Sequence, residues 1–209
     1  RACPRRYTVA QLGLGDELDG AGFTRFKLRD RGRYDMAVPA LASAPAFAWL
    51  HGPDAPWMPL VRALLGAAAR LCHVGVMLSL PGSAPQQWHS DGPHMHHSQQ
   101  LGPHALNVFV PLVALTPANG PTEFVPTTHL HWDADERPVC LTADAGDAIL
   151  FDYRTKHRGL ANRGAEPRPL VYLTYGQPWW VDAYNFSAER YHELPEPLLA
   201  RPAARDERL

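Results

Sequence analysis

The spacing of hydrophobic residues changes once along the chain, just after residue 72. Between Trp57 and Cys72 the apolar residues recur every three or four positions, as on one face of an amphipathic helix, and Pro59 is tolerated in its first turn. Beyond this segment the apolar runs are short and are separated by Gly, Pro and Asn. The pattern therefore predicts one clear helix at 57–72, followed by a β-rich region.

The β-rich region is predicted to contain a series of short strands. The candidate strands are 73–80, 86–90, 104–113, 122–126, 138–142, 147–153, 157–161 and 169–175. Short strands in close succession favour a mainly β fold, in which a double-sheet jelly roll leaves an open mouth for a ligand.

The chain is expected to form one domain. Its 209 residues are enough to bury about 70% of the surface of the unfolded chain, so a core does not depend on disulfides. The expected parts are a variable N-terminal segment at 1–56 with short elements and loops, the supporting helix at 57–72, a β core at 73–176 and a C-terminal extension at 177–209.

Composition removes several classes of function. A formal net charge of −1 without a basic run argues against nucleic acid as a partner, and the absence of a long apolar stretch argues against a membrane span. Three cysteines without CxxC spacing favour a reducing, intracellular compartment over a secreted disulfide scaffold. The sequence starts at Arg1 rather than at Met, which leaves room for a removed upstream targeting segment. Oligomeric state cannot be derived from these features.

A His-x-Asp pair is the first candidate for chemistry. His89 and Asp91 are two residues apart at the end of a candidate strand, so their side chains point to the same face. A later strand delivers His157. Two histidines and one carboxylate form a facial triad, which leaves coordination positions open for an oxo-acid and dioxygen and is typical of non-haem iron(II) oxygenases. Zinc more often takes three histidines or sulfur ligands.

Arg168 is the second candidate. It stands at the start of the apolar strand that follows His157. A guanidinium group there could bind the distal carboxylate of 2-oxoglutarate through two hydrogen bonds, a geometry that Lys does not reproduce.

Several motifs resemble those of the phytanoyl-CoA dioxygenase family, from the helix onward. Gln86–Asp91 fits the pattern QxxHxD, and Asn119–His129 resembles NGxxxxxPGSH. Gly146 and Asp147 precede the strand of the distal histidine as the family pattern requires. The run His157–Arg163 with Arg168–Tyr175 resembles HRGxxNR followed by RPxxYLxY.

The resemblance implies a double-stranded β-helix (jelly roll, cupin-like) with flanking α-helices. It also implies Fe(II) held by His89, Asp91 and His157, with 2-oxoglutarate as cosubstrate at Arg168 and dioxygen as oxidant. Gln86 and Asn107 are secondary choices for 2-oxoglutarate contacts. A buried structural role for Asn107 and an exposed position for Gln86 remain open alternatives.

Two positions depart from the family pattern. Thr127 and Thr128 stand where Gly-Ser is usual, a change that is expected only to reshape a turn. Gly159 stands two residues after the distal histidine, where Ser or Thr often assists the arginine. This second departure implies that another hydroxyl group, or water, helps Arg168.

Most other histidines are expected to be structural. The cluster His94, His96 and His97 is interpreted as an exposed polar loop rather than a second metal site. Trp179 and Trp180 follow the last strand and are expected in the core or at the rim of the mouth. The same structural interpretation covers His51, His73, His104, His129, His131 and His192.

The function predicted from these features is hydroxylation of a small organic molecule, with release of succinate and carbon dioxide. Asp91 favours hydroxylation over halogenation, because a halogenase of this class replaces that carboxylate with Gly or Ala. One alternative is a catalytically silent domain that binds metal and 2-oxoglutarate as a sensing or structural module. Another is a cupin-like hydrolase or isomerase, which would leave Arg168 without a role. The substrate itself cannot be read from the sequence, because it is chosen by variable loops.

Overall fold

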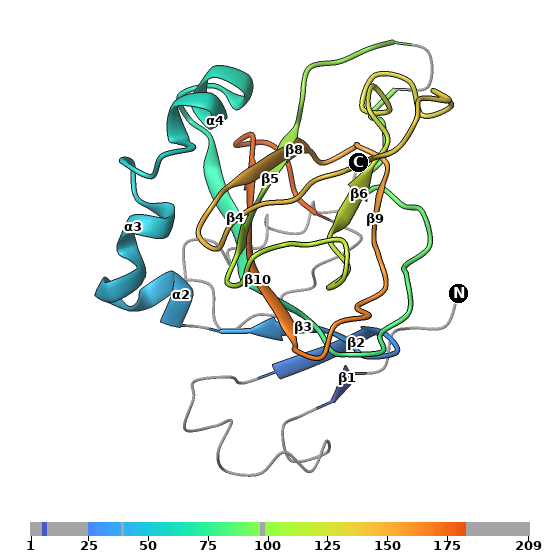
Figure 1. The fold of residues 1–209 in the computed structure, drawn as a ribbon. Helices are drawn as coiled ribbons and strands as arrows, with labels where there is room; N and C mark the ends of the chain where they lie inside the picture. Colours follow the sequence, from blue (N-terminus) through green and yellow to red (C-terminus); the bar gives the residue numbers. More distant parts are fainter. Residues whose placement is uncertain (1–5, 8–24, 39, 97–98, 183–209) are drawn as a thin grey trace, which may run out of the picture.

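The computed structural model describes residues 6–7, 25–38, 40–96 and 99–182, which form two antiparallel β-sheets flanked by short helices (Figure 1). The larger sheet has the strand order β1-β2-β3-β4-β10-β5-β8, and the smaller has the order β7-β6-β9. The strands are β1 (Arg6–Tyr7), β2 (Arg25–Asp30), β3 (Arg33–Ala37), β4 (Arg70–Ser79), β5 (Ala105–Pro111), β6 (Thr122–Phe124), β7 (Val139–Cys140), β8 (Ile149–Asp152), β9 (His157–Gly159) and β10 (Arg168–Gly176). The helices are α2 (Ala40–Ser43), the 3-10 turn η2 (Pro45–Phe47), α3 (Ala48–His51) and α4 (Met58–Leu65). The predicted mainly β, two-sheet fold with flanking helices is confirmed.

Strands β10 and β5 are neighbours in the larger sheet, each paired on both sides, and are buried along almost their whole length. Their alternate side chains point to opposite faces of the sheet. Val108 and Leu173 belong to the core cluster that includes the apolar face of α4. Phe109 and Tyr172 belong to a second cluster, which includes Phe124 of the smaller sheet. Polar residues on this second face therefore point into the space between the two sheets.

The predicted helix at 57–72 is in the right place but is too long. Helix α4 ends at Leu65, and the amide of Gly66 donates to the carbonyl oxygen of Arg62 (2.9 Å). Gly66 has a φ of 89°, a conformation that favours glycine and stops the helix. Strand β4 then begins at Arg70, so the helical spacing beyond Leu65 is coincidental. None of the helices in the described ranges has the length and apolar character needed to cross a bilayer.

The strand predictions are correct from β4 to β10, with one exception. Segment 86–90 is not a strand, and its only ladder contact is an isolated bridge between His89 and His157. No pattern in the sequence indicated that β2 and β3 extend the larger sheet beyond β4. Within the N-terminal and C-terminal segments, 1–5, 8–24, 39 and 183–209 lie outside the described residues.

Candidate metal centre

Two backbone pairings bring the predicted ligands together. His157 begins β9, and its backbone exchanges two hydrogen bonds with that of His89 (3.0 and 2.8 Å). The amides of Asp91 and Gly92 both donate to the carbonyl oxygen of Tyr153 (3.1 Å each). The loop that carries His89 and Asp91 is thus fixed to the chain that leads into β9.

The three side chains converge on one point. The Nε2 atom of His157 lies 3.7 Å from one carboxylate oxygen of Asp91, and that of His89 lies 3.9 Å from the other. One potential ligand atom from each residue lies within 4.8 Å of the other two. First-row metals bind nitrogen and oxygen at about 2.0–2.2 Å, so small rotations are enough for all three atoms to contact one ion.

In both histidines of the triad, Nδ1 bonds a backbone carbonyl, so Nε2 is available for a metal. The Nδ1 atom of His89 lies 2.8 Å from the carbonyl oxygen of Gln87, and that of His157 lies 2.8 Å from that of Thr155. A carbonyl oxygen only accepts, so Nδ1 carries the proton in both rings and Nε2 keeps its lone pair. Burial, and to a smaller extent His89, lower the pKa of His157 against the opposing effect of Asp91, which favours the neutral ligand form.

Asn107 holds the carboxylate of the triad. This residue on β5 donates from Nδ2 to Oδ2 of Asp91 (2.6 Å) and accepts a hydrogen bond from the hydroxyl of Thr174 on β10 (2.6 Å). Both residues belong to the row that faces the space between the sheets. Asn107 was predicted to contact 2-oxoglutarate, and the structure places it directly against a predicted metal ligand.

Other groups fill the space beside Gly159 that a side chain would take. A Cβ atom at this position would lie 2.7 Å from Nη1 of Arg33 and 2.8 Å from Oε1 of Gln86. Gln86 also accepts a hydrogen bond from the Gly159 amide (3.0 Å). The space that a Ser or Thr side chain would take at this position is therefore occupied by a guanidinium group from β3, where another hydroxyl group or water was expected to assist Arg168.

Two buried arginines flank Ser79 of β4, Arg33 from β3 and Arg168 from β10. Arg168 is 3% exposed and Arg33 is 5% exposed. Arg33 donates to the carbonyl oxygens of Ala84 (2.9 Å) and Leu160, whereas the Nε atom of Arg168 has no hydrogen-bond partner among the described residues. The ion pairs that the described residues form with arginine side chains involve Arg29, Arg154 and Arg158 and neither member of this pair.

The electrostatics of the two arginines favours an anionic partner. Burial, and to a smaller extent the charge of Arg33, lower the pKa of Arg168 to about 10, and burial lowers the pKa of Arg33 against the opposing effect of Asp30. Both groups remain protonated at neutral pH. Two buried cations without a carboxylate partner among the described residues favour the binding of an anion.

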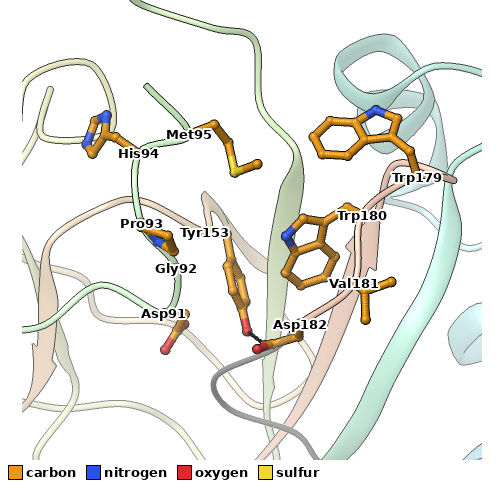
Figure 2. Close-up of a pocket in the computed structure, with 10 residues that line it drawn as sticks. All are labelled: Asp91, Gly92, Pro93, His94, Met95, Tyr153, Trp179, Trp180, Val181 and Asp182. Atoms are coloured by element: carbon orange, nitrogen blue, oxygen red, sulfur yellow. Dashed lines mark hydrogen bonds between the residues drawn. The ribbon is translucent and has the colours of Figure 1, made fainter. Parts of the chain in front are cut away.

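A pocket of about 520 Å³ opens beside the triad. Figure 2 shows Asp91 on one side of it and Trp180 and Asp182 on the other, with the ring of Tyr153 between them. The predicted position of Trp179 and Trp180 at the core or rim agrees with their places in the wall. The pocket lets a small molecule reach Asp91.

A family model described as phytanoyl-CoA dioxygenase matches residues 38–170. The chain belongs to this family. The match runs from the residue after β3 to the first residues of β10, and so includes the triad, Asn107 and Arg168.

Two curated relatives carry the name dioxygenase. Dioxygenase af480 of Aspergillus fumigatus is 29% identical over 149 residues, which cover 68% of this chain and 48% of the relative. Dioxygenase aneA of Aspergillus aculeatus is 31% identical over 132 residues, which cover 57% of this chain and 42% of the relative. The chain thus spans about half the length of the curated relatives that it matches.

Solved structures share the fold. The non-heme alpha-ketoglutarate-dependent epimerase SnoN from nogalamycin biosynthesis is 25% identical, with a TM-score of 0.56 over 70% of this chain and 61% of that chain. EctD from S. alaskensis, solved with bound Fe, is 24% identical, with a TM-score of 0.55 over 66% of this chain and 55% of that chain. The predicted jelly-roll family fold is confirmed by these likenesses.

Replacing Gly92 with Ala should weaken metal binding. A Cβ atom there would lie 2.6 Å from the ring of Tyr153, which is fully buried, so the turn that carries Asp91 has to move. We expect a loss of about 10-fold or more in Mn(II) affinity, as for other changes that misplace a ligand. Free Mn(II) measured by electron paramagnetic resonance gives the affinity. Gly102→Ala is the control, because its Cβ would meet no atom within 4 Å, and equal affinities in both variants would contradict this expectation.

Replacing Asn107 with Ala should also weaken metal binding, by about 10–100-fold, because the Asp91 carboxylate loses its donor. A second titration, with 2-oxoglutarate at saturating Mn(II), separates the two roles of this residue. Unchanged 2-oxoglutarate affinity would restrict Asn107 to positioning Asp91, whereas a further loss would support the contact predicted from the sequence. Unchanged Mn(II) affinity would contradict the positioning role.

Proposed function

We propose that this chain is an Fe(II)- and 2-oxoglutarate-dependent dioxygenase that hydroxylates a small organic molecule. One observation carries the proposal: a His-Asp-His triad with both Nε2 atoms directed at the carboxylate, in the same interior as a buried pair of arginines that lacks an acidic partner among the described residues. The first feature fits a redox metal, and the second fits the distal carboxylate of a dicarboxylic acid.

In this proposal His89, Asp91 and His157 hold Fe(II) on one face, which leaves positions for 2-oxoglutarate and dioxygen. When bound, the iron supplies the activation of dioxygen that couples decarboxylation of 2-oxoglutarate, to succinate and carbon dioxide, with hydroxylation of the substrate. The residues of the chain would position the metal ligands and shield the metal centre from water. Asn107 fixes the carboxylate of Asp91, and the buried side chain of Tyr153 keeps water from one side of the centre.

The cosubstrate is proposed to bind between the triad and the arginine pair. Arg168 would bind the distal carboxylate with its fork of donors, and Arg33 would take the part of the hydroxyl that Gly159 lacks. Gln86 would act indirectly, because it accepts a hydrogen bond from the Gly159 amide and lies beside Arg33. This arrangement replaces the hydroxyl or water that the sequence led us to expect.

Hydroxylation is the reaction type that Asp91 supports best, since the third ligand position is filled by a carboxylate and is closed to a halide. A silent binding module would use the same residues without turnover. Production of succinate from 2-oxoglutarate by the Fe(II)-loaded chain, with His157→Ala as the blank, distinguishes the two. We expect a slow basal rate that rises with a suitable small molecule. A chain that binds Mn(II) and 2-oxoglutarate but forms no succinate above the blank, with or without candidate substrates, would be the silent module.

A further inference from the structure

Ser79 lies in a row between the two buried arginines. On β4 it pairs with Arg33 of β3 on one side and with Arg168 of β10 on the other. Residues directly opposite one another on neighbouring antiparallel strands point to the same face of the sheet, with Cβ atoms about 4.5–5.5 Å apart. Leu170, two residues beyond Arg168, belongs to the cluster that includes Phe124 of the smaller sheet, so this face is turned toward the space between the sheets. The hydroxyl of Ser79, which is 1% exposed, therefore lies between two cationic side chains.

A second buried hydroxyl group contacts that of Ser79. The Oγ atoms of Ser79 and Ser83 are 2.7 Å apart, and the Oγ atom of Ser83 also accepts a hydrogen bond from the backbone amide of Asn162 (3.4 Å). Of the two hydroxyl protons, only one can lie between the two oxygens. The two hydroxyls make no other hydrogen bond to the part of the chain that the structure describes, so one proton of the pair lacks an acceptor there.

The two arginines cannot accept this proton, because a guanidinium group only donates hydrogen bonds. They also have donors that are not used. Arg33 donates from Nε and Nη2 to backbone carbonyl oxygens, and its Nη1 lies beside Gly159. The buried Nε of Arg168 has no partner in the described ranges. Buried donors need an acceptor, and a carboxylate offers about four lone pairs to such a group.

We infer that Ser79 is a third binding residue for the distal carboxylate of 2-oxoglutarate, to which its hydroxyl donates between the two guanidinium groups. The contact with Asn162 supports this direction, because the amide proton occupies one lone pair of Ser83, whose own hydroxyl then donates to Ser79. The proton of Ser79 is left for the anion, in a charge-assisted hydrogen bond. Ser79 would act in addition to Arg33 and not in its place. The inference rests on the proposed function, because it assigns a further residue to the cosubstrate site.

Removal of the Ser79 hydroxyl tests the inference. 2-Oxoglutarate and 2-oxopentanoate share the metal-binding end and the chain length, but only the first has a distal carboxylate. Each is titrated calorimetrically, without oxygen, into Mn(II)-loaded wild type and Ser79→Ala, and the Mn(II) affinity of both proteins is measured beforehand. We expect Ser79→Ala to bind 2-oxoglutarate about 10-fold or more weakly, as for the loss of a hydrogen bond to a charged group. Affinities for 2-oxopentanoate and Mn(II) should not change, whereas a general distortion of the site would lower them as well.

Two further variants separate the role of this hydroxyl from effects on packing. Ser79→Cys keeps a side chain of similar shape with only a weak S–H donor, so it should also weaken 2-oxoglutarate binding. Ser83→Ala is the matched control, because it removes a buried hydroxyl in contact with Ser79 but leaves Ser79 its own proton. Its loss of 2-oxoglutarate affinity should be smaller than that of Ser79→Ala. Melting temperatures without ligand show which variants are folded.

Three results would overturn the inference and leave the proposed function intact. The first is equal 2-oxoglutarate affinity in wild type, Ser79→Ala and Ser79→Cys. The second is a larger loss in Ser83→Ala than in Ser79→Ala, because the hydroxyl that contacts the anion would then be that of Ser83. The third is a loss that 2-oxopentanoate and Mn(II) share, or unfolding of both Ser79 variants, either of which would make Ser79 a structural residue. If wild-type protein does not bind 2-oxoglutarate in the presence of Mn(II), the proposed function itself fails, and the inference fails with it.

Discussion

His157→Ala should lose metal binding by at least about 100-fold in affinity, and with it all activity. A change that only misorients a ligand costs about 10–100-fold, and this change removes the most buried of the three ligands. His89→Ala and Asp91→Ala should behave in the same way, because two remaining side chains hold a divalent ion poorly. Metal content after dialysis, measured by plasma emission spectroscopy, tests all three variants.

A loss of folding must be separated from a loss of metal. The ring of His157 packs against Phe124 and Phe151, at 5.8 and 5.0 Å between centroids, so truncation leaves a cavity. His157→Gln fills more of that space, and the His89→Ala variant alters a more exposed position. His131→Ala, at an exposed histidine, is the control. Full metal occupancy in a folded His157→Gln or His157→Ala protein would remove this residue from the site.

Arg168→Ala should lower 2-oxoglutarate affinity by roughly 10–150-fold while the metal stays bound. A charged, bidentate contact contributes about 1.5–3 kcal/mol, which corresponds to that range. Arg168→Lys should recover only part of the loss, because an ammonium group restores the charge but not the fork. Anaerobic titration of 2-oxoglutarate into Mn(II)-loaded wild type and both variants gives the three affinities. Equal affinities would make Arg168 a structural charge without a role in cosubstrate binding.

Arg168 favours binding of 2-oxoglutarate but should lower the stability of the ligand-free protein. The pKa of Arg168 in the folded chain, about 10, is below its ordinary 12.5, so the charged form destabilises the folded state at neutral pH, and this effect fades as the pH rises above about 10. Arg168→Met should therefore leave the melting temperature of the ligand-free protein unchanged or higher. At saturating Mn(II), 2-oxoglutarate should raise the melting temperature of the wild type more than that of Arg168→Met, which still binds the metal. A large destabilisation of ligand-free Arg168→Met would contradict this account of the buried charge.

Local sequence spacing was enough to predict the positions that converge at the candidate metal centre. His89 and Asp91 are neighbours in sequence, and His157 begins a strand with clear flanking signals, so short-range patterns carry this information. The predicted strand at 86–90 was wrong, because scattered backbone hydrogen bonds, with one isolated bridge between His89 and His157, hold the loop without a continuous ladder. The side chains of His89 and Asp91 converge although they do not lie on a strand, so the alternation of side chains along a strand is not what brings them together.

Arg33 could not be predicted in the same way. It lies on β3, within a segment without a recognisable pattern, and reaches Gly159 only because β3 joins the larger sheet beside β4. The lack of a hydroxyl at Gly159 indicated that another group assists Arg168. That this group is Arg33 depends on the order of the strands in the sheet, which the sequence does not show. The end of α4 is a similar case, since Gly66 outweighed an apolar spacing that continued by chance.

The pocket wall depended on tertiary contacts as well. Trp179 and Trp180 were expected at the core or rim, and that expectation did not include Asp182 or its hydrogen bond from Tyr153. Tyr153 and Asp182 are 29 positions apart in the chain. No motif in the sequence around Asp182 indicates that its carboxylate bonds Tyr153. Its place at the pocket floor emerges only when the segment after β10 folds back across Tyr153.

The central claim is that the triad holds a metal and that this metal, together with the arginine pair, holds 2-oxoglutarate. Calorimetric titration of 2-oxoglutarate into the same protein, first freed of metal by a chelator and then loaded with Mn(II) under anaerobic conditions, tests it most directly. The account predicts one binding site per chain in the Mn(II)-loaded protein, and affinity weaker by about 10-fold or more both in metal-free wild type and in Mn(II)-treated His157→Ala. Equal 2-oxoglutarate affinity with and without metal, or no binding in either state, would contradict it.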